Sequence, residues 1–301
     1  MNNVQLLQPQ LDIQELNDVF NQPIWSVRTN SPKICFSITF KGEGDRKFQK
    51  QPKILDVLAN VLLDGAGKRD GIALKKLLSN RSIDIHTASD SDNFTIDVSC
   101  LSKYFDITID ILCELLVKAH LKADRIEIAK QELIVSLKQS IFSPHDIAME
   151  KLNNTIYPTG HRYRYTIKGT IESVEKYTKK DVDECYAKMF SPANAMIVIV
   201  SNLEPIVIKR GFKRILDVIN TKKFADSRPS AEFEQKTAIE SAGRKEHVEL
   251  DNPQSSVTFA LPGVPKNSKQ RFAVLLANSV WGQIPLVSRL SKIVRGGGGF
   301  V

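Results

Sequence analysis

An apolar strand followed by an amphipathic helix is the feature that most limits how this chain can fold. Residues 34–40 place an apolar side chain at every second position, which predicts a strand with one buried face. Residues 54–62 carry apolar side chains at helical spacing, and Gly65 follows where such a helix would end. An apolar strand face and an apolar helix stripe are both buried when they pack together, so this pair predicts a sheet covered by helices.

Strand and helix patterns continue to alternate through the first 220 residues. Residues 82–89 and 93–100 predict an antiparallel pair, because two alternating runs are separated by a short polar turn. The fold class predicted is α+β, with an antiparallel sheet packed against helices. Further strands are predicted at 25–28 and 194–202, and helices at 71–80, 103–120, 123–141, 143–157 (with Ser143 as N-cap), after Thr178, and at 204–220.

The pattern begins again after a polar stretch. Residues 221–244 have no sustained periodicity and are predicted to be a linker. Strand signals follow at 247–263, then helices at 269–283 and 288–295. The triplet Leu58-Ala59-Asn60 recurs in this part as Leu276-Ala277-Asn278.

This recurrence predicts a duplicated module with an incomplete second copy. The expected organisation is a first domain over residues 10–220, a linker over 221–244 and the start of a second domain over 245–301. The second copy is expected to be truncated, because far fewer residues follow the linker than precede it.

Charge and hydropathy exclude several classes of protein. The formal net charge is +8, but the basic residues are scattered and no aromatic residues interleave with them, so no nucleic-acid partner is expected. No apolar run approaches the roughly 18 residues of a membrane span. The first residues lack the basic start and apolar stretch of a signal peptide, so a cytoplasmic location is expected of the chain as written.

The cysteines and histidines predict no metal site. None of the four cysteines forms a CxxC motif, and Cys35 and Cys100 are predicted to be reduced core residues because they lie in apolar runs. No two histidines are spaced as HxxxH. Asp84 and His86 share a predicted strand face near an acidic turn at 90–93, but this turn lacks the glycine and distal glutamate of a calcium loop.

Three sequence blocks together resemble a known family. They are SITFKGEG with LLDGAGKRDGIALKKLL, the segment from YPTGHRYRY to SPANAMIVIVSN, and VTFALPGVPKN with SRLSKIVR. In this order, over residues 13–295, the blocks resemble the M16 metallopeptidases, the pitrilysin and insulinase family, and especially the branch of mitochondrial processing peptidase. The resemblance implies two related α+β halves that enclose a chamber for extended peptides.

The resemblance also locates the family's catalytic motif, HxxEH, on the helix at 54–62. In that motif two histidines bind zinc and the glutamate activates a water molecule. Here both histidines and the general base are replaced, which implies no catalytic residue, no metal ligand set and no cofactor. Aligned on LLDGAG, the five positions are Asp56, Val57, Leu58, Ala59 and Asn60.

Two further positions follow from the resemblance. The family's third zinc ligand, a glutamate, falls near Lys130 to Glu132, where Glu132 is a retained carboxylate. The family's substrate-binding arginine corresponds to Arg295, whereas its tyrosine partner would fall one position beyond Val301. The glycine run after Arg295 suggests a gene interrupted at this point, with a natural flexible tail as the alternative.

The function implied is that of a catalytically inactive M16 homologue. Such a subunit would pair with an active, zinc-bearing M16 partner in a heterodimer and complete a chamber for a peptide substrate. The alternatives are a structural scaffold subunit, as in the core proteins of respiratory complexes, or the product of a decaying gene. An active zinc endopeptidase is the least favoured reading, and family members work in the cytoplasm, the periplasm or the mitochondrial matrix.

Overall fold

The structure is a computed structural model of the chain. It describes residues 12–16, 23–41, 51–90, 92–141, 143–158, 163–164, 170–221, 243–253, 255–284 and 286–297. The predicted linker lies almost entirely outside these residues, and the predicted domain boundaries stay predictions.

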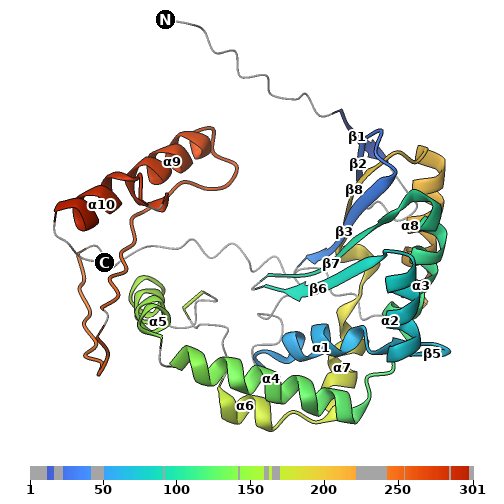
Figure 1. Cartoon of the computed structure of the whole chain (residues 1–301), viewed down its shortest axis with the longest axis horizontal. Coiled ribbons are helices and arrows are strands. Elements are labelled where there is room, and N and C mark those ends of the chain that lie inside the picture. The colour runs from blue at the N-terminus through green and yellow to red at the C-terminus, as the bar shows by residue number, and fades with distance from the viewer. Residues whose placement is uncertain are drawn as a thin grey trace, which may run out of the picture.

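A six-stranded sheet forms the centre of the molecule (Figure 1). Neighbouring strands are antiparallel, as predicted, except that β2 and β8 run parallel. The parallel pair is possible because the chain between these two strands is long enough to cross over. The spatial order is β1 (Ile13–Leu16), β2 (Ile24–Arg28), β8 (Ala195–Ser201), β3 (Lys33–Lys41), β7 (Asn93–Leu101) and β6 (Asp84–Ser89).

Helices pack against one face of this sheet (Figure 1). The predicted helix starts are confirmed: the Ser143 side chain accepts a hydrogen bond from the Asp146 amide, and Thr178 and Asp181 form a capping box. The α+β fold with helices against a sheet is therefore confirmed. The helices are α1 (Ile54–Leu62), α2 (Gly71–Asn80), α3 (Phe105–Lys118), α4 (Ala123–Ile141), α5 (Pro144–Ile156), α6 (Ile171–Glu175), α7 (Lys179–Met189) and α8 (Pro205–Asn220). A short hairpin of β4 (Gly65–Ala66) and β5 (Arg69–Asp70), which the sequence patterns did not predict, joins α1 to α2.

Aromatic side chains join the sheet to the helices. Phe36 of β3 meets Phe105 of α3 and Phe212 of α8 edge to face, at centroid distances of 6.2 and 5.2 Å. Phe190, at the end of α7, makes similar contacts with Phe40 and two other rings. Edge-to-face pairs stabilise by about 0.5–1.5 kcal/mol beyond the area they bury. These contacts fix which face of the sheet is the core.

The opposite face of the sheet is open to solvent over its central strands. Side chains alternate along a strand, so Ile34 and Phe36 point into the core while Cys35 and Ser37 point away from it. The prediction that Cys35 is a core residue is therefore wrong, because it occupies the outward position of its strand and is exposed. Cys100 is buried, as predicted, and burial raises the pKa of its thiol.

The part of the chain after the predicted linker lies apart from the sheet (Figure 1). The strand predicted over 247–263 is not formed in the described residues of that range, which pair with no neighbouring strand. An extended segment becomes a strand only when another strand satisfies its backbone groups. The helices predicted next are present as α9 (Arg271–Asn278), continued by η4 (Ser279–Gln283), and as α10 (Arg289–Ser291), continued by η5 (Lys292–Gly297).

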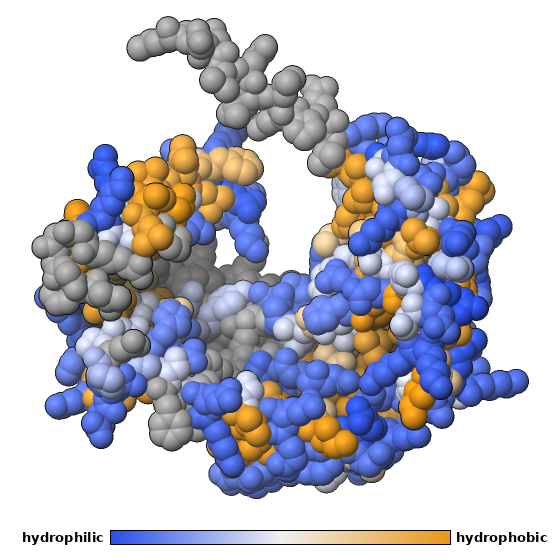
Figure 2. Space-filling model, viewed as in Figure 1, coloured by the Kyte–Doolittle hydropathy of each residue, from blue (hydrophilic) through white to orange (hydrophobic). Residues whose placement is uncertain are grey.

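The side chains of this C-terminal part are largely uncovered. Phe272 is 76% exposed and Leu276 is 67% exposed, although both lie on the helix predicted to be amphipathic. Figure 2 shows apolar residues gathered over this region. α9 echoes α1 in sequence, but no second sheet accompanies it in the described residues, so the duplicated module stays a prediction.

None of the helices in the described ranges combines the length and the apolar character that crossing a lipid bilayer requires.

A test of the core is the substitution Gly211→Ala. A Cβ atom at this position on α8 would lie 2.6 Å from Cε1 of Phe105, so the aromatic cluster or the backbone must shift. Overpacking of this kind outweighs the gain in helix propensity, and we expect a net loss of about 1–2 kcal/mol in the free energy of unfolding. Urea denaturation followed by circular dichroism measures it.

Gly263→Ala is the matched control, because a Cβ atom there meets no atom within 4 Å. Equal stability of the two variants would show that α3 and α8 are not packed as described.

Candidate functional site

Helix α1 presents two polar side chains one turn apart. It buries Leu55, Leu58 and most of its other residues, while Asn60 is exposed and Asp56 is partly exposed. Ala59, which the resemblance aligns with the family's general base, is 7% exposed and offers a methyl group with no proton to transfer.

Two hydrogen bonds attach this helix to the edge strand β6. The Thr87 hydroxyl donates to the carbonyl oxygen of Ala59 at 2.8 Å, and the Ser89 hydroxyl donates to Oδ1 of Asp56 at 3.3 Å. The polar positions of α1 therefore lie beside one end of the sheet edge.

A lysine from the same helix terminus pairs with Asp56. Lys53 Nζ lies 2.6 Å from Oδ2 of Asp56, and the two side chains are only 22% and 26% exposed. Lys53 adopts a left-handed backbone conformation, with φ of 71°, at the N-cap of α1. A non-glycine residue in this conformation costs about 1 kcal/mol, which the ion pair helps to offset.

A second lysine occupies the region of the predicted third ligand. Lys130 of α4 is 6% exposed, and its ammonium donates to Oε2 of Glu127 and to the carbonyl oxygens of Glu175 and Tyr177, at 3.0, 3.1 and 2.9 Å. The hydrogen bond from Lys130 holds the pKa of the Glu127 carboxyl below its usual value. This buried ammonium joins α4 to the segment that connects α6 and α7.

These side chains do not fit a zinc ion. Zinc sites in proteins need three or four histidine, cysteine or carboxylate ligands. Asp56 is already paired with an ammonium, Asn60 offers a weak amide ligand, and Glu132 is exposed on α4. Across the described residues, no three histidine, cysteine, aspartate or glutamate side chains are grouped so as to hold a metal ion.

The predicted substrate-binding residue is only partly described. Arg295 belongs to η5, but its side chain lies outside what the structure describes, and its role stays a prediction.

The two lysines whose contacts dominate this region were not predicted from the sequence. Lys130 carried a detectable signal, since it lies four residues after Ile126 and four before Ile134 on the apolar stripe of α4. A lysine on an apolar stripe predicts a buried or interfacial ammonium. Lys53 carried no such signal, because its left-handed conformation places the side chain over Asp56.

Comparison with known proteins agrees with the resemblance found in the sequence. Residues 176–300 match the family model of the peptidase M16 inactive domain. The chain is 22% identical over 262 residues to the non-peptidase homolog YmxG of Helicobacter pylori, a match that covers 86% of the chain. The chain is thus similar to M16 peptidase homologues over most of its length. It is also similar, at 18% identity over 79% of its length, to an uncharacterized zinc protease of Streptomyces coelicolor.

A solved structure has the same fold as this chain. The crystal structure of a peptidase M16 inactive domain from Pseudomonas fluorescens superposes with a TM-score of 0.74 at 16% identity, over 96% of this chain and 69% of that one. The chain spans 58% and 51% of the length of the two curated relatives.

Substitutions at Lys53 separate its two contributions. Lys53→Met removes the ion pair and keeps the strained backbone, whereas Lys53→Gly removes both. We expect Lys53→Met to lower the free energy of unfolding by about 1–2 kcal/mol, and Lys53→Gly to be more stable than Lys53→Met by about 1 kcal/mol. Thermal and urea unfolding measure both values.

Adding Asp56→Asn to Lys53→Met is expected to recover part of the loss, because the uncompensated carboxylate is removed. If the double variant is less stable than Lys53→Met, the ion pair is not the source of the effect.

Lys130→Met tests the buried ammonium. The substitution keeps a similar volume but leaves the carbonyl oxygens of Glu175 and Tyr177 without this donor, so we expect a loss of about 2 kcal/mol in unfolding free energy. Lys138→Met, at an exposed position of the same helix, is the control and is expected to change stability by less than about 0.5 kcal/mol. Similar stability of the two variants would contradict the described contacts of Lys130.

Proposed function

We propose that this M16 homologue holds an extended peptide without cleaving it, as the non-catalytic subunit of a pair with a zinc-bearing M16 peptidase. The observation that carries the proposal is the state of helix α1. Its scaffold is retained beside a sheet edge, while Asp56 is paired with Lys53 and Ala59 replaces the base. A chain that has this helix beside a sheet edge, but has neither zinc ligands nor a general base on it, is suited to binding a peptide without cleaving it.

The edge strand β6 supplies a place for the peptide. It pairs with β7 on one side and, in the described part of the chain, with no strand on the other. An unpaired edge offers backbone donors and acceptors to which an extended peptide adds as a further strand. The bonds from Thr87 and Ser89 to α1 keep this edge beside the former catalytic helix.

The similar proteins support the part of the proposal in which the chain acts as a non-catalytic subunit beside a partner. The matching model is that of an inactive M16 domain, and one relative is named a non-peptidase homolog. A non-catalytic subunit contributes by shaping the chamber and by gripping the substrate, for which Arg295 is the candidate from the family resemblance. The zinc and the base would then come from the partner.

A permanent scaffold subunit is the second candidate. The exposed apolar residues of the C-terminal part, such as Phe272 and Leu276, favour contact with another chain. Both candidates share this feature, so peptide binding is the property that separates them.

Reconstitution with a defined partner tests the proposal. The purified chain would be mixed with an HxxEH-bearing M16 subunit from the same organism, and cleavage of a quenched fluorescent peptide would be followed with each subunit alone and with both. We expect the chain alone to bind the peptide by fluorescence anisotropy and to release no product. The pair is expected to cleave at least about tenfold faster than the partner alone, because remote binding contacts position the substrate.

The matched control is the partner with its HxxEH glutamate replaced by glutamine, mixed with the same chain. Cleavage that persists with this inactive partner would mean that the M16 homologue is itself a peptidase. Absence of peptide binding with an intact complex would instead favour the scaffold.

A further inference from the structure

Large apolar side chains are exposed along the whole C-terminal part of the chain. Phe272 and Leu276 lie one turn apart on the same side of α9, and Ile293 of η5 is 71% exposed. Phe259 and Trp281 meet edge to face at a centroid distance of 5.0 Å, and both are also exposed. Figure 2 shows that these residues form an apolar region on the surface. A region of this kind marks a site of contact.

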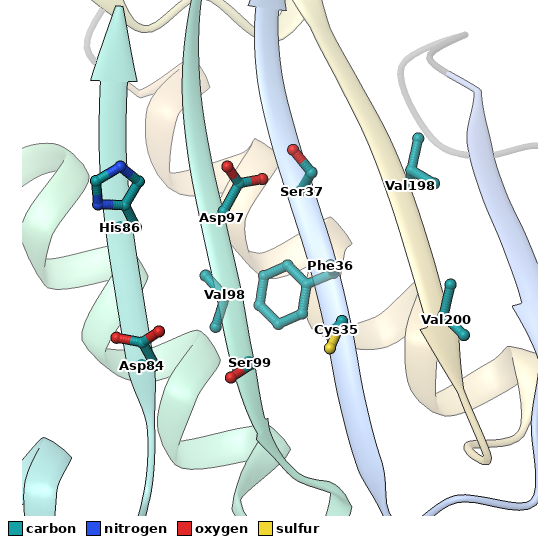
Figure 3. Close-up of a pocket in the computed structure, with 10 residues that line it drawn as sticks. All are labelled: Cys35, Phe36, Ser37, Asp84, His86, Asp97, Val98, Ser99, Val198 and Val200. Atoms are coloured by element: carbon teal, nitrogen blue, oxygen red, sulfur yellow. The ribbon is translucent and has the colours of Figure 1, made fainter. Parts of the chain in front are cut away.

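The open face of the sheet is different in character. Its exposed valines, Val198 and Val200, lie in a shallow depression of about 320 Å³ that they share with Ser37, His86 and Asp97 (Figure 3). Apolar and polar groups alternate there, which is ordinary for a surface in contact with water. The concentration of apolar side chains is therefore a property of the C-terminal part.

The same part of the chain is basic and contains no acidic residue. All 34 aspartate and glutamate residues of the chain lie before residue 252, whereas six lysine and arginine residues lie after it. Lys266, Lys269 and Arg271 lie at or just before the start of α9, Arg289 lies in α10 and Lys292 begins η5, and all five are exposed. No carboxylate of this segment balances their charge. Whatever covers the apolar residues therefore meets a positively charged surface.

We propose that the C-terminal part binds the surface of a bilayer that contains anionic lipids, with the exposed side chains of α9 entering the headgroup layer. Helices that lie in a membrane interface combine apolar and aromatic residues with lysine and arginine, as this segment does. Trp281 suits the boundary between headgroups and acyl chains, because its ring is apolar and its N–H group is polar. The contact is peripheral and is independent of the proposed peptide binding.

Charge distinguishes a lipid surface from other occupants. Two copies of the chain would bring equal positive charges together, which opposes their association. A protein partner would need a carboxylate-rich surface of matching shape. An anionic bilayer supplies negative headgroups and, because it is fluid, accepts apolar side chains at any spacing. The bilayer therefore satisfies the charge and the apolar character together.

Vesicles of two compositions test the inference with the full chain. One set would contain phosphatidylcholine alone and the other about one-third phosphatidylglycerol, and flotation would give the partition coefficient for each. We expect partitioning to be at least about fivefold stronger on the anionic vesicles, with the difference shrinking as salt rises.

Tryptophan fluorescence gives a second readout. The emission of Trp281 is expected to shift to shorter wavelength when anionic vesicles are added, because its ring leaves water. The other tryptophan of the chain, Trp25, lies in strand β2 of the sheet. Trp281→Phe is therefore expected to abolish the shift while partitioning stays nearly unchanged.

A double variant, Phe272→Ser with Leu276→Ser, tests the apolar contact. We expect its partition coefficient on anionic vesicles to fall about tenfold, because the bilayer would cover less apolar area. Ile206→Ser is the matched control, since Ile206 of α8 is 73% exposed but lies outside the C-terminal part, and it is expected to leave partitioning unchanged. Circular dichroism checks that each variant keeps its helices.

Two pairs of lysine substitutions test the charge. Lys266→Gln with Lys269→Gln is expected to weaken partitioning on anionic vesicles roughly tenfold and to leave partitioning on phosphatidylcholine unchanged. Lys76→Gln with Lys180→Gln removes the same charge from exposed positions of α2 and α7 and is the control. Its partitioning is expected to match that of the parent chain.

Equal partitioning on the two kinds of vesicle, no partitioning on either, or an equal loss in the two lysine pairs would overturn the inference. Sedimentation velocity without lipid tests the second copy as the occupant. A dimer that the Phe272 and Leu276 double variant disrupts, together with no vesicle binding, would assign the surface to self-association and would overturn the inference as well. Each of these results leaves the peptide-binding proposal standing, because its test contains no lipid.

Discussion

Burial of one face of the sheet is the constraint on which the rest of the structure depends. Phe36 packs against Phe105 of α3 and Phe212 of α8, so its face of the sheet is covered by these helices. Since side chains alternate along each strand, the burial of Phe36 places Cys35 and Ser37 on the opposite, outward face. The open face of the sheet is therefore a consequence of how the core packs, whereas the edge of β6 is open because β6 is the last strand in the order of the described sheet.

The region that the resemblance aligns with the zinc motif is held together by charges of the chain itself. Lys53 neutralises Asp56, and Lys130 satisfies backbone carbonyl oxygens at the region of the third ligand. Two fixed ammonium groups now stabilise elements that a divalent cation would join in a zinc site. The helix is held against β6 by its buried apolar side chains and by the hydrogen bond from Thr87 to the carbonyl oxygen of Ala59, so this attachment needs no metal ion.

Regular alternation made much of the fold predictable from sequence. The strands at 34–40 and 93–100 and the helix at 54–62 have one clearly apolar face, and the structure places them as expected. Cys35 was misplaced because it was assigned from its apolar neighbours, although the period of two over residues 34–40 places it on the face opposite to Ile34 and Phe36. The strand predicted over 247–263 failed because pairing is non-local. At the site, the absence of histidines could be seen directly in the sequence. The ion pair of Lys53 with Asp56 could not be predicted, because it depends on a left-handed backbone conformation that has no local sequence signal.

The ion pair of Lys53 with Asp56 has a consequence for any attempt to engineer a metal centre on helix α1. Replacing Asp56 with histidine alone would leave the Lys53 ammonium beside the new ligand, and a second histidine and a general base would still be needed. A redesign of this helix would therefore have to change Lys53 together with the ligand positions, because a cation brought to a single histidine would meet an ammonium and too few donor atoms.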